Sequence, residues 1–344
     1  MASNSVRPTA TTSSAKNVTL GVVIALGLVY VIWGSTYLGI RFADQTMPPL
    51  LMGGVRFLIA GTLLYLWCRA RGIPTPSWRE WRSTGVVGLC LLAGGNGTVI
   101  VVEQQVPSGI AALLVALVPL WIVVLQWLRR SSVRPTLRTL AGVGLGLVGV
   151  GLLATHGGGT GGQGVNPMAL LLVLSSGIWA WGTLYAQRAT LPSSPLMSTA
   201  VEMLVGGAAL LLAGIVAREP AMLAGHTISV KSWLALGYLI IFGSIVAYTA
   251  YTWLLRKASP ALVSTYAYVN PLVAVLLGWV FAGESVTHWT LISSAIIVSS
   301  VVLITLPRRA SIARSLRTQG NAASSASGNA SEEPRAAVEG SRAG

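Results

Sequence analysis

The chain has 344 residues, of which 53% are hydrophobic and only 9% are charged, and its mean hydropathy is +0.70. This composition is far more apolar than that of an average soluble protein, so it excludes a single soluble domain. The formal charge of +14 comes from 23 Lys and Arg against 9 acids, and the basic residues lie between apolar runs. This placement indicates membrane orientation rather than a nucleic-acid partner.

Ten apolar runs follow one another along the chain, and a hydrocarbon core about 30 Å thick needs roughly 20 apolar residues per helix. Long continuous runs predict helices, because every backbone group must be satisfied in lipid, whereas a barrel would show short alternating segments. We therefore predict an all-α integral membrane protein with ten transmembrane helices. The predicted spans are 20–42, 49–68, 84–102, 108–128, 139–155, 167–186, 196–217, 232–255, 261–282 and 287–306.

The segments outside these spans are polar or rich in small residues. Residues 1–19 are predicted to be a disordered cytoplasmic leader, since the first run is too long for a signal-peptide core and no cleavage pattern follows it. Residues 156–166 are predicted to be a glycine-rich external linker, and residues 307–344 a disordered cytoplasmic tail. Cys68 and Cys90 have neither disulfide nor zinc-ligand spacing, so we expect two free thiols.

The basic residues are distributed unevenly between the two sides of the predicted bundle. With the N-terminus inside, 19 Lys and Arg fall on the inner side, and only Arg41, Arg218 and Lys231 fall on the outer side. The positive-inside rule therefore places both termini in the cytoplasm. Arg56 lies within a span.

Two pairs of motifs recur at a nearly constant distance. Residues 33–37 read Trp-Gly-Ser-Thr-Tyr, and residues 181–185, which lie 148 positions later, read Trp-Gly-Thr-Leu-Tyr. Residues 116–120 (Ala-Leu-Val-Pro-Leu) correspond to residues 268–272 (Tyr-Val-Asn-Pro-Leu) at an offset of 152. Since a five-span unit has an odd number of helices, its second copy must enter the membrane in the opposite direction, as in the inverted repeats of secondary transporters. The predicted repeats are 20–155 and 167–306.

The motifs together resemble those of bacterial drug/metabolite transporters with two EamA-type repeats, close to the YedA-like exporters. The segments that carry the resemblance, between residues 20 and 306, are 33–37, 54–57, 95–97, 106–109, 242–244, 259–261, 266–271 and 283–284. The resemblance implies ten helices, a central cavity shared by the repeats, transport of small organic solutes and a bacterial inner-membrane location. One departure is visible, because many relatives have Gly-Glu where this chain has Ser131-Ser132, so only Glu284 of that pair of acids is kept.

Several residues are candidates for the wall of a central cavity. Pro119 and Pro271 lie near the middle of their spans, where each removes an amide donor and frees backbone carbonyls; the alternative is a purely structural kink. Aromatic residues could contact organic solutes or cations, or could instead anchor helix ends at the membrane interface. The predicted cavity residues are Trp33, Tyr37, Arg56, Asn96, Pro119, Trp181, Tyr185, Glu202, Tyr248, Tyr266, Asn270 and Pro271.

Charged residues in or beside the spans are few. Arg56 and Glu202 occupy equivalent places in the two repeats, roughly 10 Å apart in depth by helix rise, so we expect no direct salt bridge; each could contact substrate or pin its own helix. Glu103 could pair with Arg41 in an outer gate, or could be a solvated loop acid. The candidates for proton coupling or a gate are Glu103, Glu202 and Glu284. Glu202 is favoured because we expect the other two to be wetter.

An intramembrane enzyme is the competing class. The three histidines lie in loops or at span ends, no H-E-x-x-H motif occurs, and Asp44 is the only aspartate. These absences disfavour a metalloprotease or an aspartyl dyad, and the lack of a Walker A motif disfavours ATP hydrolysis. We expect no enzyme activity, no metal and no cofactor.

The residues and the resemblance together predict a secondary transporter. It would export small amphipathic metabolites or drugs by alternating access, with or without coupling to protons. A facilitated-diffusion uniporter or an exchanger is the alternative, and an intramembrane enzyme is less favoured. The expected partners are a small-molecule substrate and the lipid bilayer; a homo-oligomer is left open.

Overall fold

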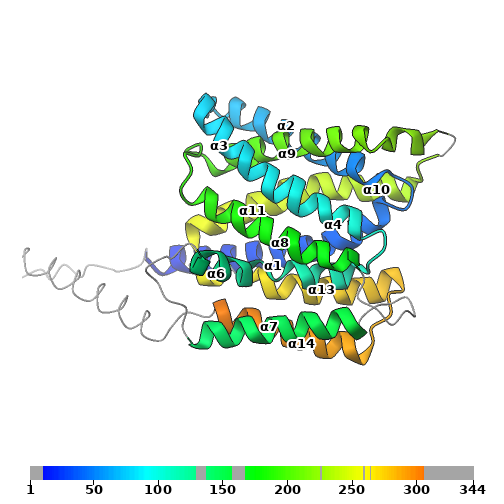
Figure 1. Cartoon of the computed structure of the whole chain (residues 1–344). Coiled ribbons are helices and arrows are strands. Elements are labelled where there is room, and N and C mark those ends of the chain that lie inside the picture. The colour runs from blue at the N-terminus through cyan, green and yellow to red at the C-terminus, as the bar shows by residue number, and fades with distance from the viewer. Residues whose placement is uncertain are drawn as a thin grey trace, which may run out of the picture. The chain divides into compact units, whose positions relative to one another are not determined.

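The computed structural model describes residues 11–128, 137–156, 167–224, 227–258, 260–263 and 265–305. Every regular element in these ranges is a helix, and the long helices run side by side (Figure 1). The elements are α1 (Thr11–Ala43), α2 (Pro49–Ala70), α3 (Trp78–Gly88), η1 (Leu89–Asn96), α4 (Gly97–Val102), α5 (Ser108–Val115), α6 (Val118–Leu128), α7 (Leu137–His156), α8 (Pro167–Ala186), α9 (Pro195–Val216), η2 (Glu219–Leu223), α10 (Val230–Tyr238), η3 (Leu239–Val246), α11 (Ala247–Lys257), α12 (Pro260–Val263), α13 (Tyr266–Ala282) and α14 (His288–Thr305).

Seven helical stretches in the described ranges are long and apolar enough to cross a membrane. They are Leu20–Ala43, Pro49–Ala70, Trp78–Val102, Ser108–Leu128, Pro167–Ala186, Pro195–Val216 and Val230–Leu254. Three shorter apolar helices, Leu137–Leu152, Val269–Ala282 and His288–Leu303, lie at the fifth, ninth and tenth predicted spans. The fold is therefore an all-helical bundle with multiple membrane-spanning helices, and the full count of ten remains a prediction.

Several boundaries differ from the predicted ones. The helix of the first span begins at Thr11, within the predicted leader. The helix of the third span begins at Trp78 instead of residue 84, because Ser77 and Glu80 form a capping box that satisfies free amide groups of the polar first turn. Hydropathy alone misses this start, since the first turn of the helix is polar.

The fourth and ninth spans are interrupted at different places. In the fourth span, α5 ends at Val115 and α6 begins at Val118, so the chain leaves the helix just before Pro119. In the ninth span, the short α12 ends at Val263, whereas Pro271 lies inside the continuous helix α13. The two prolines thus occupy different local structures, although they match in sequence.

The third and eighth spans each contain a π-helical stretch in the middle of an α-helix. The stretches η1 and η3 are both eight residues long, and they start at Leu89 and Leu239, which are 150 positions apart. A π-helix bonds i to i+5 and is rare, mostly appearing as single turns within α-helices at functional sites. The two halves of the chain therefore each carry a π-helical stretch at a matching position.

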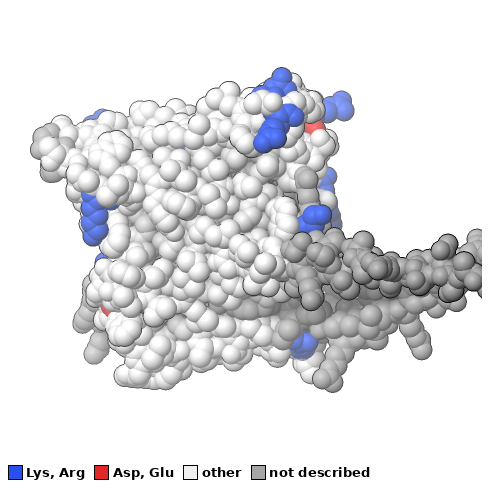
Figure 2. Space-filling view, turned by 180° about the vertical axis from the view of Figure 1, so that it is seen from behind, with Lys and Arg blue, Asp and Glu red and all other residues white. Residues whose placement is uncertain are grey.

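The most extensive helix packing in the described bundle joins α2 to α9. A Cβ atom added at Gly61 of α2 would lie 2.9 Å from the Cβ of Met203 and 3.0 Å from the carbonyl oxygen of Ala200. Further contacts run between α7 and α14 and between α1 and both α11 and α13. The middle of the face in Figure 2 lacks the colours of charged residues, which gather toward the helix ends. Exposed apolar side chains such as Leu63, Leu66 and Trp279 fit contact with lipid.

Parts of the sequence-based prediction lie outside the described residues. These are residues 1–10 of the leader, residues 157–166 of the linker, Ser131-Ser132, His226 and the tail 307–344.

Candidate functional site

Arg56 lies about 10 Å along α2, by helix rise, and only 3% of it is exposed. Its Nε donates a hydrogen bond to Ser244 Oγ at 3.0 Å, and its guanidinium lies 4.7 Å from the Phe57 ring centroid. Its Nη1 is buried and has no hydrogen-bond partner in the described part of the chain. A guanidinium is always charged, so this group is a buried cation with an unused donor.

Ser244 and its neighbour Gly243 belong to the π-helical stretch η3. A Cβ atom added at Gly243 would lie 3.1 Å from Arg56 Nη2 and 2.9 Å from Thr36 Cγ2. The absence of a side chain at this position therefore lets the guanidinium lie directly against η3. We call Thr36, Arg56, Gly243 and Ser244 the Arg56 site.

Four aromatic residues gather beside the Arg56 site and form what we call the aromatic cluster: Trp33, Tyr248, Tyr251 and Tyr266. The Trp33 ring lies 5.2 Å from that of Tyr248, 5.1 Å from that of Tyr251 and 5.2 Å from that of Tyr266, between ring centroids. Tyr248 follows Ser244 by four residues on one continuous helical run, so it lies about one turn away. The structure thus brings together four predicted residues: Trp33, Arg56, Tyr248 and Tyr266.

Asn270 lies close to the aromatic cluster, and its side chain bonds to main-chain carbonyl oxygens. Only 9% of it is exposed, and its amide nitrogen, in the orientation that suits its neighbours, donates to the carbonyl oxygens of Tyr30 and Tyr266 at 3.3 and 3.2 Å. The bond to Tyr30 joins α13 to α1, whereas the bond to Tyr266 lies within α13. Pro271, next to it, is buried.

The remaining predicted cavity residues are more scattered. Trp181 is 38% exposed, and its ring stacks on that of Tyr185 at 5.5 Å. Trp181 also lines a shallow apolar pocket of about 330 Å³ with Trp121 and Leu174. This pair is therefore not part of the aromatic cluster, although its motif matches that of Trp33 and Tyr37. Tyr37, Asn96, Pro119 and Glu202 are partly buried.

Among the described residues, Glu202 of α9 and Arg56 of α2 form no ion pair with each other. The two helices nevertheless pack closely against each other. The backbone of Glu202 is approached by α3, since a Cβ added at Gly88 would lie 2.4 Å from its carbonyl oxygen. Glu202 of α9 therefore lies at a junction with α2 and α3, which small residues allow to pack closely.

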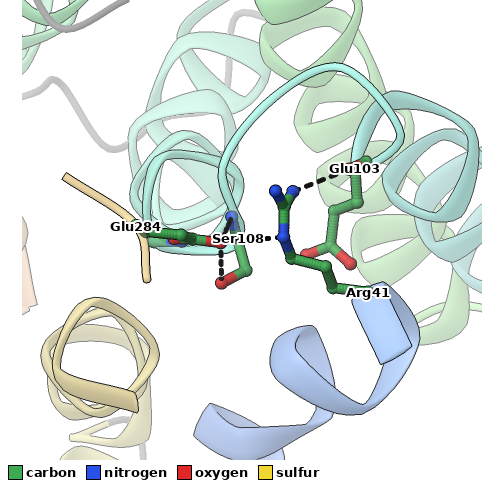
Figure 3. A network of polar contacts seen from close by, with 5 residues as sticks. Arg41, Glu103, Ser108 and Glu284 are labelled. Atoms are coloured by element: carbon green, nitrogen blue, oxygen red, sulfur yellow. Dashed lines mark hydrogen bonds and ion pairs between the residues drawn. The ribbon is translucent and has the colours of Figure 1, made fainter. Parts of the chain in front are cut away.

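A network of charges lies at the end of the bundle where α1 ends, α2 and α5 begin and α13 ends; we call it the acidic end. Glu284 accepts hydrogen bonds from the amide and hydroxyl groups of Ser108, both at 2.8 Å, and from the amide of Gly109 at 3.3 Å (Figure 3). Its Oε1 also lies 3.5 Å from Arg41 Nε. A carboxylate at the first turn of α5 satisfies free amides and complements the helix dipole.

The turn before Glu284 depends on glycine. Gly283 has φ of 65°, the left-handed region, and the amide of Glu284 donates to the carbonyl of Gly278 at 3.1 Å. This is the usual way in which a helix ends at glycine. The Gly283-Glu284 pair thus ends α13 and directs the acid toward α5.

Glu103 is buried at the acidic end, which corrects the expectation that it is wetter than Glu202. It is 1% exposed, and neither carboxylate oxygen has a hydrogen-bond partner among the described residues. The side chain of Glu284 is also buried, at 6% exposure. Arg41 pairs with Glu284, and it donates only to the main-chain carbonyl of Glu103, at 3.4 Å.

Burial sets the protonation of the acids that lack partners. It raises the pKa of Glu103 well above its ordinary value, with Asp44 and Glu284 adding to the rise and Arg41 and Arg56 opposing it. Both carboxylate oxygens of Asp44 are buried and unbonded within the described ranges. Burial, helped by Glu219, raises the pKa of Asp44 to about 8.

Sequence reasoning missed several residues at these sites. Glu219 accepts hydrogen bonds from the amides of Leu50 and Leu51 at 3.1 and 2.9 Å, so it caps α2 as Glu284 caps α5. The signal for Glu219 was weak, because one acid in a short loop fits many roles. Ser244 had a better signal, since it lies in the motif 242–244. The described part of the chain has no group of three or more His, Cys, Asp or Glu that could hold a metal.

Comparison with known proteins gives a consistent family. The model of the EamA-like transporter family matches twice, at residues 19–155 and 166–306. The chain is 44% identical over 284 residues to the uncharacterized inner membrane transporter YedA of Escherichia coli (strain K12), covering 82% of this chain and 90% of that protein. It is 24% identical to the uncharacterized transporter YvbV of Bacillus subtilis, over 87% of this chain and 96% of that one.

A solved structure supports the fold. A crystal structure of another protein matches with a TM-score of 0.56 at 22% sequence identity, covering 83% of this chain and 96% of that chain.

Proposed function

Since the chain belongs to the EamA-like transporter family, we propose that it is a secondary transporter that exports small amphipathic metabolites or drugs by alternating access. The observation that carries this is the composition of what we call the central site, which is the Arg56 site together with the aromatic cluster. Trp33 and Arg56 come from the first family domain, and Ser244, Tyr248 and Tyr266 come from the second. A site between two repeats can be exposed to either side when one repeat rocks against the other.

The proposed architecture is two inverted repeats of five helices in a bacterial inner membrane. The matched motifs, the duplicated family domain and the matching π-helical stretches support two related halves. The excess of Lys and Arg on one side supports cytoplasmic termini, which makes the acidic end the outer end. The name of the relative YedA supports the inner membrane.

Proton coupling is the proposed energy source, with facilitated diffusion as the alternative. A proton-driven carrier needs a group whose protonation and substrate binding depend on each other. Glu202 lies at a junction of helices in a span, and Glu103, just after a span, is buried without a hydrogen-bond partner in the described part of the chain. These two acids are therefore the candidates for the coupling group, and Glu284 is a candidate for an outer gate through its bond to α5.

Assays on reconstituted protein test both the transport function and its coupling to protons. Purified protein in proteoliposomes is screened against small metabolites and drugs with and without an imposed pH gradient. We expect uphill movement of a solute only with the gradient, and Glu202→Gln to lose this dependence while still exchanging solute downhill. Glu103→Gln, assayed beside it, tells which of the two acids carries the proton.

The results separate the alternatives. A wild-type protein that equilibrates a solute without ever concentrating it would establish facilitated diffusion. Wild-type protein that moves no solute, but acts on lipid or peptide, would replace the transporter by an enzyme.

A further inference from the structure

We propose that Arg56 is the anion-binding group of the central site, and that the transported solute is a small organic acid with a carboxylate on an apolar or aromatic body. This rests on the proposed transport function and narrows it to a substrate class. The steps are the unused donor of Arg56, the lack of a counter-ion, the contact of the guanidinium with Gly243 and the aromatic cluster beside it.

The first step is the incomplete satisfaction of Arg56. Its guanidinium is 3% exposed and carries five N–H donors, and only a neutral hydroxyl, Ser244 Oγ, is bonded to its Nε. Its Nη1 has no partner among the residues described. A buried charge in a span is costly unless it is paired, so such residues mark substrate or ion pathways. The unused Nη1 is a donor that a ligand could satisfy.

The second step is the lack of a counter-ion in the protein. Within the described ranges, the ion pair formed is Arg41 with Glu284, and no carboxylate lies within ion-pair distance of Arg56. Glu103 is the acid near enough to affect it, but burial raises the pKa of Glu103 well above its ordinary value. Neither oxygen of Glu103 has a hydrogen-bond partner among the described residues, so Arg56 has no counter-ion there, and a bound solute can supply the balancing anion.

The third step is the shape of the site. Because residue 243 is glycine, no side chain at this position separates η3 from Arg56 Nη2, which an added Cβ would approach to 3.1 Å. A guanidinium binds carboxylates through two parallel hydrogen bonds, which needs two adjacent donors free of bulky neighbours. Ser244 fixes the third nitrogen, Nε, and so orients the plane of the group.

The fourth step is the aromatic cluster next to the charge. Trp33 packs its ring about 5 Å from three tyrosine rings, and one of these, Tyr248, lies one helical turn from Ser244. Aromatic walls alone would also suit a cation. The fixed positive charge of Arg56 at the edge of this wall repels a cation, so an anion with an apolar body fits the two features together.

Three probes that differ only in their polar end test this assignment: 3-phenylpropionate, its neutral amide 3-phenylpropionamide and the cation 3-phenylpropylamine. Each is measured for binding, as the thermal shift of the purified full-length protein, and for counterflow in proteoliposomes. We expect the carboxylate to bind at least about tenfold more tightly than the amide, as one charge-assisted hydrogen bond allows, and the amine to bind weakest.

The variants assign the preference to Arg56. Arg56→Gln should bring the ratio of carboxylate to amide affinity to about one, and Ser244→Ala, which frees the guanidinium, should reduce the ratio. Arg79→Gln, at an exposed position outside the site, serves as the matched control. It should keep the wild-type ratio of carboxylate to amide affinity. If Arg56→Gln does not fold, judged by its elution profile and thermal unfolding, Arg56→Lys and Ser244→Ala carry the comparison.

Failure of this assignment differs from failure of the transport function. Wild-type protein that moves the amide or the amine in preference to the carboxylate remains a transporter, but Arg56 is then not its anion site. A carboxylate preference that survives in Arg56→Gln, or a carboxylate that does not bind wild type, overturns the assignment as well. Wild-type protein that moves no solute in the wider screen overturns transport itself.

Discussion

Asp44 couples protonation to stability because its carboxylate is buried without a hydrogen-bond partner in the described structure. Burial and the nearby Glu219 raise its pKa to about 8, whereas the same group in an unfolded chain titrates near 4. Between these two values the folded state holds a proton that the unfolded state has lost. The free energy of unfolding therefore falls as the pH rises from about 4 to about 8.

We predict that Asp44→Asn removes part of this pH dependence. Wild-type protein should unfold at a temperature several degrees lower at pH 8 than at pH 5.5, and Asp44→Asn should show a smaller difference, because asparagine does not ionise. Thermal unfolding of the purified protein at both pH values measures this. Glu103 adds to the slope in the same direction, so some dependence should remain in the variant.

The control for Asp44 is Gln45→Asn, which changes an exposed neighbour in the same loop without removing a titrating group. It should show the pH dependence of wild type. Equal slopes for wild type and Asp44→Asn would mean that Asp44 is ionised in the folded protein.

The roles of individual residues could be predicted from the sequence only in part. Arg56 and Glu202 stand out because they are charged residues in apolar runs, and the helix rise gives their separation in depth. The Ser244 partner of Arg56 comes from a helix 188 positions away, which no local pattern reveals. The burial of Glu103 was missed for a similar reason, since it ends a span in the sequence but is covered by other helices in space.

At the scale of elements, Glu284 joins the end of α13 to the start of α5 and to Arg41 of α1. We predict that Glu284→Ala lowers the stability by about 1–3 kcal/mol, because two amides of α5 and a hydroxyl lose a charged acceptor. Thermal unfolding of the purified variant, or its midpoint in denaturant, measures the loss.

Glu80 provides a matched control for Glu284. It also caps a helix, since its Oε2 accepts hydrogen bonds from the amide and hydroxyl of Ser77, but it lies at an exposed helix start. Glu80→Ala should cost about 1 kcal/mol or less. A loss for Glu284→Ala no larger than that for Glu80→Ala would mean that the buried bonds to α5 contribute little.

The contact between α2 and α9 depends on the lack of side chains at their crossing. We predict that Gly61→Ala destabilises the protein by about 1–3 kcal/mol, because the added methyl group would lie 2.9–3.0 Å from Met203, Ala200 and Leu204. Gly27→Ala is the matched control, since nothing lies within 4 Å of a Cβ there. It should be neutral or stabilising by about 0.5–1 kcal/mol, as alanine favours the helix. Equal unfolding temperatures for the two variants would contradict this.

The elements themselves were largely predictable, because long apolar runs have few structural solutions. The second span was predicted at 49–68, and α2 covers Pro49–Ala70. The interruptions were harder to predict. Proline at position 119 signals the break that precedes it, but the same residue at 271 lies within a helix, because a proline can be accommodated where neighbouring helices satisfy the freed carbonyl.

At the scale of the whole molecule, the orientation of the chain across the membrane can be tested. A single cysteine placed in residues 157–164 of a variant without Cys68 and Cys90 should react from outside with an impermeant thiol reagent in intact cells. A cysteine placed after Pro307 should react only after the membrane is opened, because the distribution of Lys and Arg places the tail inside. The reverse labelling pattern would overturn the proposed topology.

The duplication has a consequence for the history of the fold. A π turn takes one residue more than an α turn, so a helix acquires one by the insertion of a residue. The stretches η1 and η3 have the same length and lie 150 positions apart, one in each of the two family domains. Two separate insertions at corresponding sites would be a coincidence. A single insertion that preceded the duplication of the domain would account for both stretches at once.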